Sequence, residues 1–219
     1  RVTILNVLIC AKLWYIGACV AFTSNFLTKV DRLLFSFLAK AKWVNRHTLL
    51  LPPVEGGLGV YSITARLAAF RVDHLRRLIS GSAARWTVFA RYWVGLSLRQ
   101  WAPQGASNLL PHCLEWQPEY YVHALGELRK LCSGLNGLDP LTLRVKRAYQ
   151  AILPQYTLAP RCVSSAPGVD FTQTWRWLEE GNLDPRSRDV MWRLVHRILA
   201  VGALLVRFKI TKDATCPLC

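Results

Sequence analysis

The sequence predicts a mainly α-helical protein, in which a bundle of helices is followed by a helical linker region and a short cysteine-containing end. Apolar residues recur at spacings of three and four along several stretches, which is the period of a helix with one buried face. No stretch alternates apolar and polar residues as a half-buried strand does. Apolar residues make up 52% of the 219 residues, which excludes a disordered tail and suits one large domain or two small ones.

The first expected helix lies in the apolar stretch from Ile4 to Phe22, which only Asn6 and Lys12 interrupt. Such a stretch resembles a signal peptide or a membrane span. Lys12 argues against both, because a lysine at the centre of a span costs about 2.5–3.5 kcal/mol. We therefore predict a buried helix, with Lys12 at its edge reaching toward a phosphate.

Two further helices are expected over residues 26–41 and 62–79. Their apolar faces comprise Val30, Leu33, Leu34, Phe37 and Leu38 in the former and Ala68, Val72, Leu75 and Ile79 in the latter. Arg66 and Arg77 fall on the opposite face of the 62–79 helix, and Arg71 and Arg76 lie on its flanks, which predicts a basic outer surface.

The connector between these helices, residues 51–59, is rich in proline and glycine and predicts a structural turn. Glycine-rich segments also bind phosphates, but no Gly-Lys-Ser/Thr follows, so this is not a P-loop.

The second half of the chain predicts helices over 120–132 and 141–153, a proline-containing linker over 154–170, and a helix over 171–180. Asp184 is suited to be a helix N-cap, and Pro185 to be the first residue of that helix. We expect this helix to run to about residue 200. Its apolar stripe comprises Met191, Leu194, Val195 and Ile198. His196 has no nucleophile or acid at a telling spacing, so we expect it to pack near Trp192.

We divide the chain into a basic region (1–99), a linker region (100–170) and a last segment (171–219).

Positive charge is concentrated in the first half, where residues 1–99 hold 14 Lys and Arg against three acids, in a chain of net charge +15. The guanidinium group of arginine matches the spacing of phosphate oxygens, so this excess of positive charge favours a polyanionic partner. Nucleic acid is the first candidate and an anionic membrane surface is the second. A solvated basic face without a partner is the third alternative. The candidate nucleic-acid-binding residues are Lys12, Lys29, Arg32, Lys40, Lys42, Arg46, Arg66, Arg71, Arg76 and Arg77.

The seven cysteines are odd in number and widely spread, which favours a reducing compartment over a disulfide scaffold. Cys216 and Cys219 are spaced so that both thiolates reach one zinc ion, but a closed zinc site needs four ligands. Because the sequence opens on Arg1 and stops within this motif, we expect a fragment of a longer protein.

Three segments together resemble the non-LTR (LINE-type) retrotransposon reverse transcriptases. Residues 2–9 with 12–15 look like the helix that follows the polymerase core, and residues 51–60 are similar to the family's Pro-x-x-x-Gly-Gly-x-Gly-Leu connector, with Val60 in place of the usual leucine. Arg66 and residues 69–71 (Ala-Phe-Arg) continue that similarity. Residues 191–197 with Cys216-Pro217-Leu218-Cys219 look like the start of the family's zinc-binding segment.

The resemblance implies thumb-like helices, a linker region and a truncated zinc knuckle from the C-terminal part of such a polymerase. The family's polymerase needs paired aspartates to hold two Mg²⁺ ions, and the seven aspartates here all stand singly, so we expect no catalysis by this chain. The implied role is to grip the template–primer duplex and the element's RNA through phosphates. The implied partners are RNA, DNA and the polymerase core of the same parent chain, and a membrane is not among them. The implied location is a ribonucleoprotein of the nucleus and cytoplasm, and the protein is not expected to be secreted.

Two other classes stay open on the sequence alone. One is a membrane-associated basic helical protein, suggested by the apolar stretch 4–22 and its basic flanks. The other is a stand-alone zinc-binding interaction module built on Cys216 and Cys219. An unrelated enzyme has no residue constellation to support it.

Overall fold

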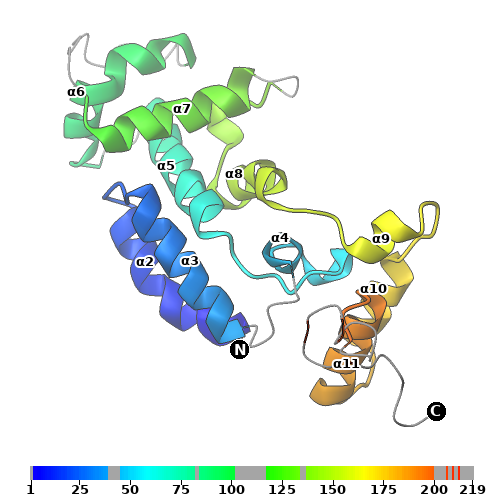
Figure 1. The fold of residues 1–219 in the computed structure, drawn as a ribbon. Coiled ribbons are helices and arrows are strands. Elements are labelled where there is room, and N and C mark those ends of the chain that lie inside the picture. The colour runs from blue at the N-terminus through cyan, green and yellow to red at the C-terminus, as the bar shows by residue number, and fades with distance from the viewer. Residues whose placement is uncertain are drawn as a thin grey trace. The chain divides into compact units, whose positions relative to one another are not determined.

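A computed structural model describes residues 2–38, 45–81, 84–101, 117–133 and 137–199, together with residues 206, 209 and 212. Every regular element in these ranges is a helix, and no strand occurs in them (Figure 1). The expected mainly α fold is therefore confirmed.

Contacts between residues group the chain into two units. Unit 1 contains Thr3–Leu34 and Tyr61–Tyr156, and unit 2 contains Phe35–Val60 and Thr157–Cys219. Residues 35–60, which the sequence places within the basic first region, thus associate with the last part of the chain. Each unit is described separately below.

Unit 1 begins with a continuous helical stretch made of α1 (Val2–Ile4), the π-helical turn η1 (Leu5–Ile9) and α2 (Cys10–Gly17). Within the described residues, no helix has both the length and the apolar character needed to cross a membrane. The expectation of a buried helix is wrong for one side of this stretch, where side chains are 42–83% exposed: Ile4, Val7, Leu8, Ile9, Tyr15 and Ile16. Only its other side packs on unit 1, through Leu5, Cys10 and Gly17.

Helix α5 (Ile63–Ile79) is the centre of unit 1 (Figure 1). Ser62 caps it by accepting a hydrogen bond from the backbone N–H of Ala65. Among the described elements it contacts α2, α6 (Thr87–Leu98), α7 (Glu119–Ser133), α8 (Val145–Ile152) and a 3-10 turn, η5 (Pro140–Thr142). The predicted apolar face is confirmed, but the predicted basic outer surface is only partly so, because Arg77 is exposed while Arg76 is only 18% exposed. With helices on several sides, α5 buries even Arg71 and Asp73.

Helices α7 and α8 agree with the expected ranges 120–132 and 141–153 to within a few residues, whereas the sequence analysis gave no helix at α6. Short 3-10 turns extend them: η3 (Arg99–Trp101), η5 (Pro140–Thr142) and η6 (Leu153–Tyr156). The side chain of Tyr149 on α8 reaches the start of α5, where its hydroxyl oxygen accepts a hydrogen bond from the N–H of Ser62 at 3.1 Å. This bond joins the middle of α8 to the N-cap of α5.

Helix α3 (Ser24–Leu38) contains the boundary between the two units. Its predicted apolar face is only partly confirmed. Leu34 and Phe35 are buried, but Leu33 is 68% and Phe37 is 43% exposed.

Unit 2 contains α4 (Arg46–Leu49), the 3-10 turn η2 (Pro53–Glu55), α9 (Arg161–Ser165), α10 (Thr172–Glu180) and α11 (Pro185–Val195). Asp184 caps α11 as predicted, accepting from the N–H groups of Arg186 and Ser187. The predicted stripe is only partly confirmed, because Ile198 is buried but Leu194 is 51% exposed, and the buried positions include Trp192 and His196. Helix α11 ends earlier than expected, and Arg197 follows with a left-handed φ of 55°.

Candidate nucleic-acid interface

Three predicted cations at the amino end of unit 1 are free to meet a polyanion. Lys12 on α2 and Lys29 and Arg32 on α3 are all exposed. None of them forms an ion pair with a residue in the described ranges. An exposed cation without an acidic partner keeps its full attraction for a phosphate.

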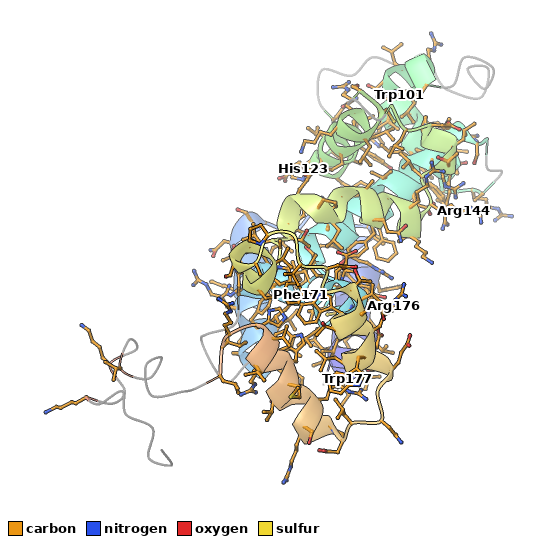
Figure 2. All side chains as sticks on the ribbon, turned by 90° about the vertical axis from the view of Figure 1, so that its right-hand side faces the viewer. Trp101, His123, Arg144, Phe171, Arg176 and Trp177 are labelled. Atoms are coloured by element: carbon orange, nitrogen blue, oxygen red, sulfur yellow. The ribbon has the colours of Figure 1, made fainter. Side chains whose placement is uncertain are left out.

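Helix α8 carries a second set of free cations, Arg144, Lys146 and Arg147 (Arg144 is labelled in Figure 2). All three are exposed and make no ion pair with the described residues, while Ala148, Tyr149 and Ile152 on the other side of α8 enter the core. Sequence reasoning missed these residues. Apolar residues at 145, 148, 149 and 152 do follow the helical period, so the cations between them could have been recognised as an outer face.

Arg66 lies within an aromatic cluster of unit 1 and not on an open surface. Its guanidinium carbon is 4.1 Å from the ring centroid of Tyr61, 5.6 Å from that of Phe70 and 5.7 Å from that of Tyr149. Its Nε is buried without a hydrogen-bond partner in the described structure. These contacts give Arg66 a packing role that joins α5 to α8.

Replacing Arg66 by glutamine is expected to lower the stability of the chain by about 1–2 kcal/mol, because a partly desolvated cation–π contact is worth that much. The salt dependence of nucleic-acid binding should stay unchanged. Arg129→Gln, which removes an exposed arginine of α7, is the control and should leave stability unaltered. Urea unfolding and binding titrations at several salt concentrations measure both quantities. A flattened salt dependence with full stability would instead place Arg66 on a phosphate.

Arg71 is also withdrawn from solvent. Its side chain stands over the ring of Tyr120 at 5.7 Å, and burial lowers the pKa of Arg71 from its usual value. The hydroxyl of Tyr120 donates to the carbonyl oxygen of Ala18 at 2.8 Å, and burial raises the pKa of this phenol. This cluster ties α5 and α7 to the end of α2 and offers little to a phosphate.

Asp73 holds the last two predicted arginines of α5. Its buried carboxylate accepts from Nε of Arg76 at 2.7 Å and from Nε of Arg77 at 2.9 Å. The Arg76 side chain is only 18% exposed, whereas that of Arg77 is 55% exposed. Because one carboxylate already serves both groups, they are weaker phosphate ligands than the unpaired cations of α3 and α8.

The other predicted site residues lie elsewhere. Arg46 is exposed on α4 in unit 2, where its guanidinium stands 5.2 Å from the ring centroid of Phe35. Lys40, Lys42, Cys216 and Cys219 fall outside the described residues. Within the described ranges, His, Cys, Asp and Glu residues form no group of three or more that could hold a metal ion, so the zinc site stays a prediction.

The glycine-containing connector has a structural role in unit 2. The carbonyl oxygen of Gly56 accepts a hydrogen bond from the indole N–H of Trp192 at 3.0 Å and lies 2.7 Å from Nε2 of His196. The imidazole packs on Trp192 with ring centroids 4.1 Å apart, and burial lowers the pKa of His196. Both the predicted turn and the predicted packing of His196 are confirmed.

One comparison with known proteins gives a match. A stretch of 92 residues, 41% of the chain, is 33% identical to a protein of Xenopus laevis described as transposon TX1 uncharacterized 149 kDa protein, of which it covers 7%. No family model and no solved structure matches the chain. The similarity supports a transposon-related origin for this protein.

Proposed function

We propose that this protein is a nucleic-acid-binding part of a retrotransposon reverse transcriptase, and that unit 1 grips duplex nucleic acid and the element's RNA through phosphates. The observation that carries the proposal is the set of six exposed cations of unit 1 that have no acidic partner in the described structure: Lys12, Lys29, Arg32, Arg144, Lys146 and Arg147. The transposon-related origin supports it, as does the resemblance of the connector to that polymerase family. The proposal assigns no polymerase chemistry to this chain, because its aspartates stand singly.

Helix α8 provides the most concentrated of these charges. Arg144 is its N-cap residue, and Lys146 and Arg147 lie in its first turn. The positive end of the helix dipole adds to the attraction of these side chains for an anion. Contacts of this kind fix the position of a duplex without reading its sequence, so we expect binding with little sequence preference.

Replacing Arg144, Lys146 and Arg147 together by glutamine in the full chain is expected to weaken binding to a short RNA–DNA hybrid. The plot of log affinity against log salt should flatten by about two to three units, roughly one for each phosphate that the variant no longer neutralises. A second triple variant, Lys12→Gln, Lys29→Gln and Arg32→Gln, tests the amino-terminal set in the same way. Circular dichroism of each variant checks that the helices are retained.

The matched control removes the same amount of charge from ion-paired positions. Arg77, Lys130 and Arg193 lie within 2.7–2.9 Å of Asp73, Glu127 and Asp189, so their replacement by glutamine should change the slope little. If this control weakened binding as much as the α8 triple variant, binding would follow net charge alone. The proposed assignment to unpaired cations would then be wrong.

A further inference from the structure

The outer face of helix α6 combines aromatic rings with arginines, and the phosphate contacts proposed above do not use it (Figure 1). The inner face of this helix, with Ala90, Val94 and Leu98, is buried where α6 meets α5 and α7. Spacings of three and four place a row of exposed side chains on the opposite side: Arg85, Val88, Phe89, Tyr92, Leu96 and Arg99. Phe89 is 75% exposed, so its ring is open to a ligand.

The two ends of this row carry positive charge, from Arg85 and Arg99. Residues 74–114 contain no Asp or Glu in the sequence. Neither arginine forms an ion pair with a residue that the structure describes. The two acids of the neighbouring helix α7, Glu119 and Glu127, have partners on that same helix. The row therefore joins apolar surface to cations that are available to an anion.

The ring of Tyr92 is supported by the core of unit 1. It meets the ring of Trp93 edge to face, with centroids 5.3 Å apart and planes at 84°. Trp93 packs against the core, and its carbonyl oxygen accepts a hydrogen bond from the side-chain amide of Gln117 at 3.0 Å. A ring fixed in this way loses little conformational freedom when a flat ligand stacks on its open side.

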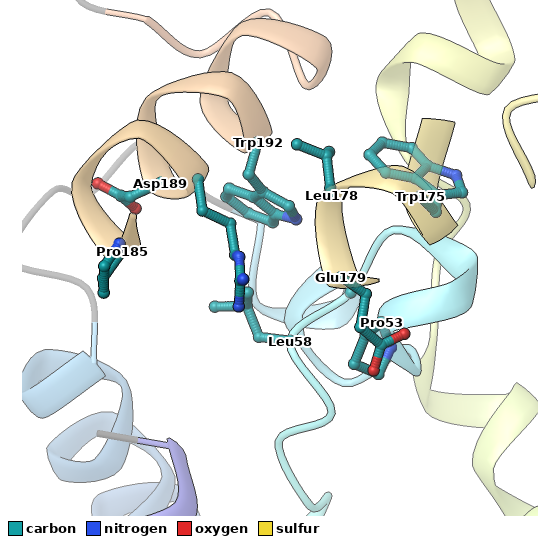
Figure 3. Close-up of a pocket in the computed structure, with 10 residues that line it drawn as sticks. Pro53, Leu58, Trp175, Leu178, Glu179, Pro185, Asp189 and Trp192 are labelled. Carbon is teal, nitrogen blue, oxygen red and sulfur yellow. The ribbon is translucent and has the colours of Figure 1, made fainter. Parts of the chain in front are cut away.

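A pocket in unit 2 offers the contrast (Figure 3). Its volume is about 370 Å³, but the indoles of Trp175 and Trp192 that line it are only 4% and 8% exposed. The charges at its opening cancel when the partner of Asp189 is included: Glu179, Arg188, Asp189 and Arg193. On α6, by comparison, the rings are accessible and the arginines have no acidic partner in the described ranges.

From this arrangement we infer that the outer face of α6 binds a single-stranded segment of nucleic acid, with bases stacked on Phe89 and Tyr92. The phosphates of the strand meet Arg85 and Arg99. Stacking on aromatic rings and contact between cations and the backbone are the two interactions that hold unpaired strands on proteins. In a duplex the bases stack on one another, so their faces are closed to Phe89. The inference rests on the proposed function and adds unpaired nucleotides to the duplex that unit 1 grips.

Two strands of equal length, one with bases and one without, provide the first test. Oligodeoxythymidylate of ten nucleotides and an abasic strand of ten deoxyribose phosphates carry the same phosphate charge. We expect the full chain to bind the strand with bases about five-fold or more tightly, as one stacked base would give. Fluorescence anisotropy of end-labelled strands measures both affinities. Equal affinity for the two strands would show that no base stacks, and it would overturn the inference.

Substitutions at Phe89 then separate stacking from apolar contact. Phe89→Leu keeps an apolar side chain and removes the ring, so binding of oligodeoxythymidylate should weaken about five-fold or more, whereas Phe89→Trp should retain it. Val88→Ala, in the same row, is the matched control and should leave binding unchanged. Circular dichroism checks that each variant keeps its helices. Full affinity in the leucine variant would mean that the face needs only apolar surface, as a protein partner would, and the inference would be wrong.

The RNA–DNA hybrid distinguishes this site from the duplex contacts of α8. Phe89→Leu should leave the affinity for the hybrid unchanged, while the α8 triple variant weakens it. An equal loss of hybrid and single-strand binding in Phe89→Leu would overturn the inference and leave the α8 assignment intact. Full hybrid affinity in the α8 variant, together with single-strand binding that depends on Phe89, would contradict the α8 assignment and support this site.

Discussion

Replacing Gly57 by alanine is expected to destabilise unit 2 by about 3 kcal/mol or more, the upper part of the range for adding an atom to a packed site. An added Cβ would fall on the carbonyl group and Cα of Leu51. These are backbone atoms that cannot rotate away as a side chain can. The carbonyl oxygen of Leu51 already accepts a hydrogen bond from the N–H of Gly59 at 2.9 Å. The substitution therefore separates the two ends of the turn on which Trp175 and Trp192 pack.

Hydrogen exchange of α10 and α11, together with urea unfolding, measures this effect. Two other glycines serve as controls. Gly59 has a φ of 66° but no atom closer than 3.4 Å to an added Cβ, so Gly59→Ala should cost only about 1–2 kcal/mol from backbone strain. Gly126 on α7 has open space around it, so Gly126→Ala should raise stability by up to about 1 kcal/mol. Equal stability of the Gly57 and Gly126 variants would show that the turn is not packed as described.

The local features of the fold could be predicted from the sequence because they depend on neighbouring residues. Asp184 followed by Pro185 indicates a helix start, and the structure confirms both the cap and the proline position. The spacing of Val72, Leu75 and Ile79 indicates the buried face of α5. Each of these signals lies within a few turns of helix, where periodicity and capping apply directly.

The failures concern residues whose surroundings come from distant parts of the chain. Periodicity treats an arginine opposite an apolar stripe as exposed, but Arg66 packs against Tyr149 and Arg71 against Tyr120. The apolar stretch 4–22 suggests burial on all sides, but it packs on one side only.

The candidate sites depend on the same long-range contacts. The sequence indicates a turn at Gly56, but not that its carbonyl group accepts from Trp192, 136 positions away. Nor does it indicate that Pro53 and Leu58 close a pocket with α10 and α11. The candidate phosphate-binding residues could be chosen from the positions of lysine and arginine in the sequence. The pairing of Asp73 with Arg76 and Arg77 is an exception, because its spacings of three and four on one helix could have been recognised from the sequence.

Lowering the pH from about 6.5 to 4 is expected to reduce the stability of unit 1 by up to about 3 kcal/mol through His74. Burial, and then the nearby charge of Arg77, lower the pKa of His74 from 6.5 to about 4, while Asp73 opposes the shift. The imidazole lies 4.4 Å from the ring of Trp86, and its Nε2 is buried without a hydrogen-bond partner in the described structure. Above pH 6.5 the histidine is neutral in both states, so it adds no pH dependence. As the pH falls below 6.5 the unfolded chain takes up a proton before the folded chain does, and each pH unit favours unfolding by about 1.4 kcal/mol until about pH 4.

Urea unfolding at a series of pH values measures this effect, with the exchange rates of α5 and α6 amides reporting on unit 1. His74→Phe keeps an aromatic ring beside Trp86 and removes the titrating group, so its stability should vary less between pH 6.5 and 4 than that of the parent chain. His123→Gln is the matched control. His123 is exposed on α7, 3.7 Å from Glu119, and its removal should leave the pH dependence nearly unchanged. If the phenylalanine variant were destabilised by acid as much as the parent chain, His74 would not be the group that titrates. The acid sensitivity of unit 1 would then arise from its carboxylates.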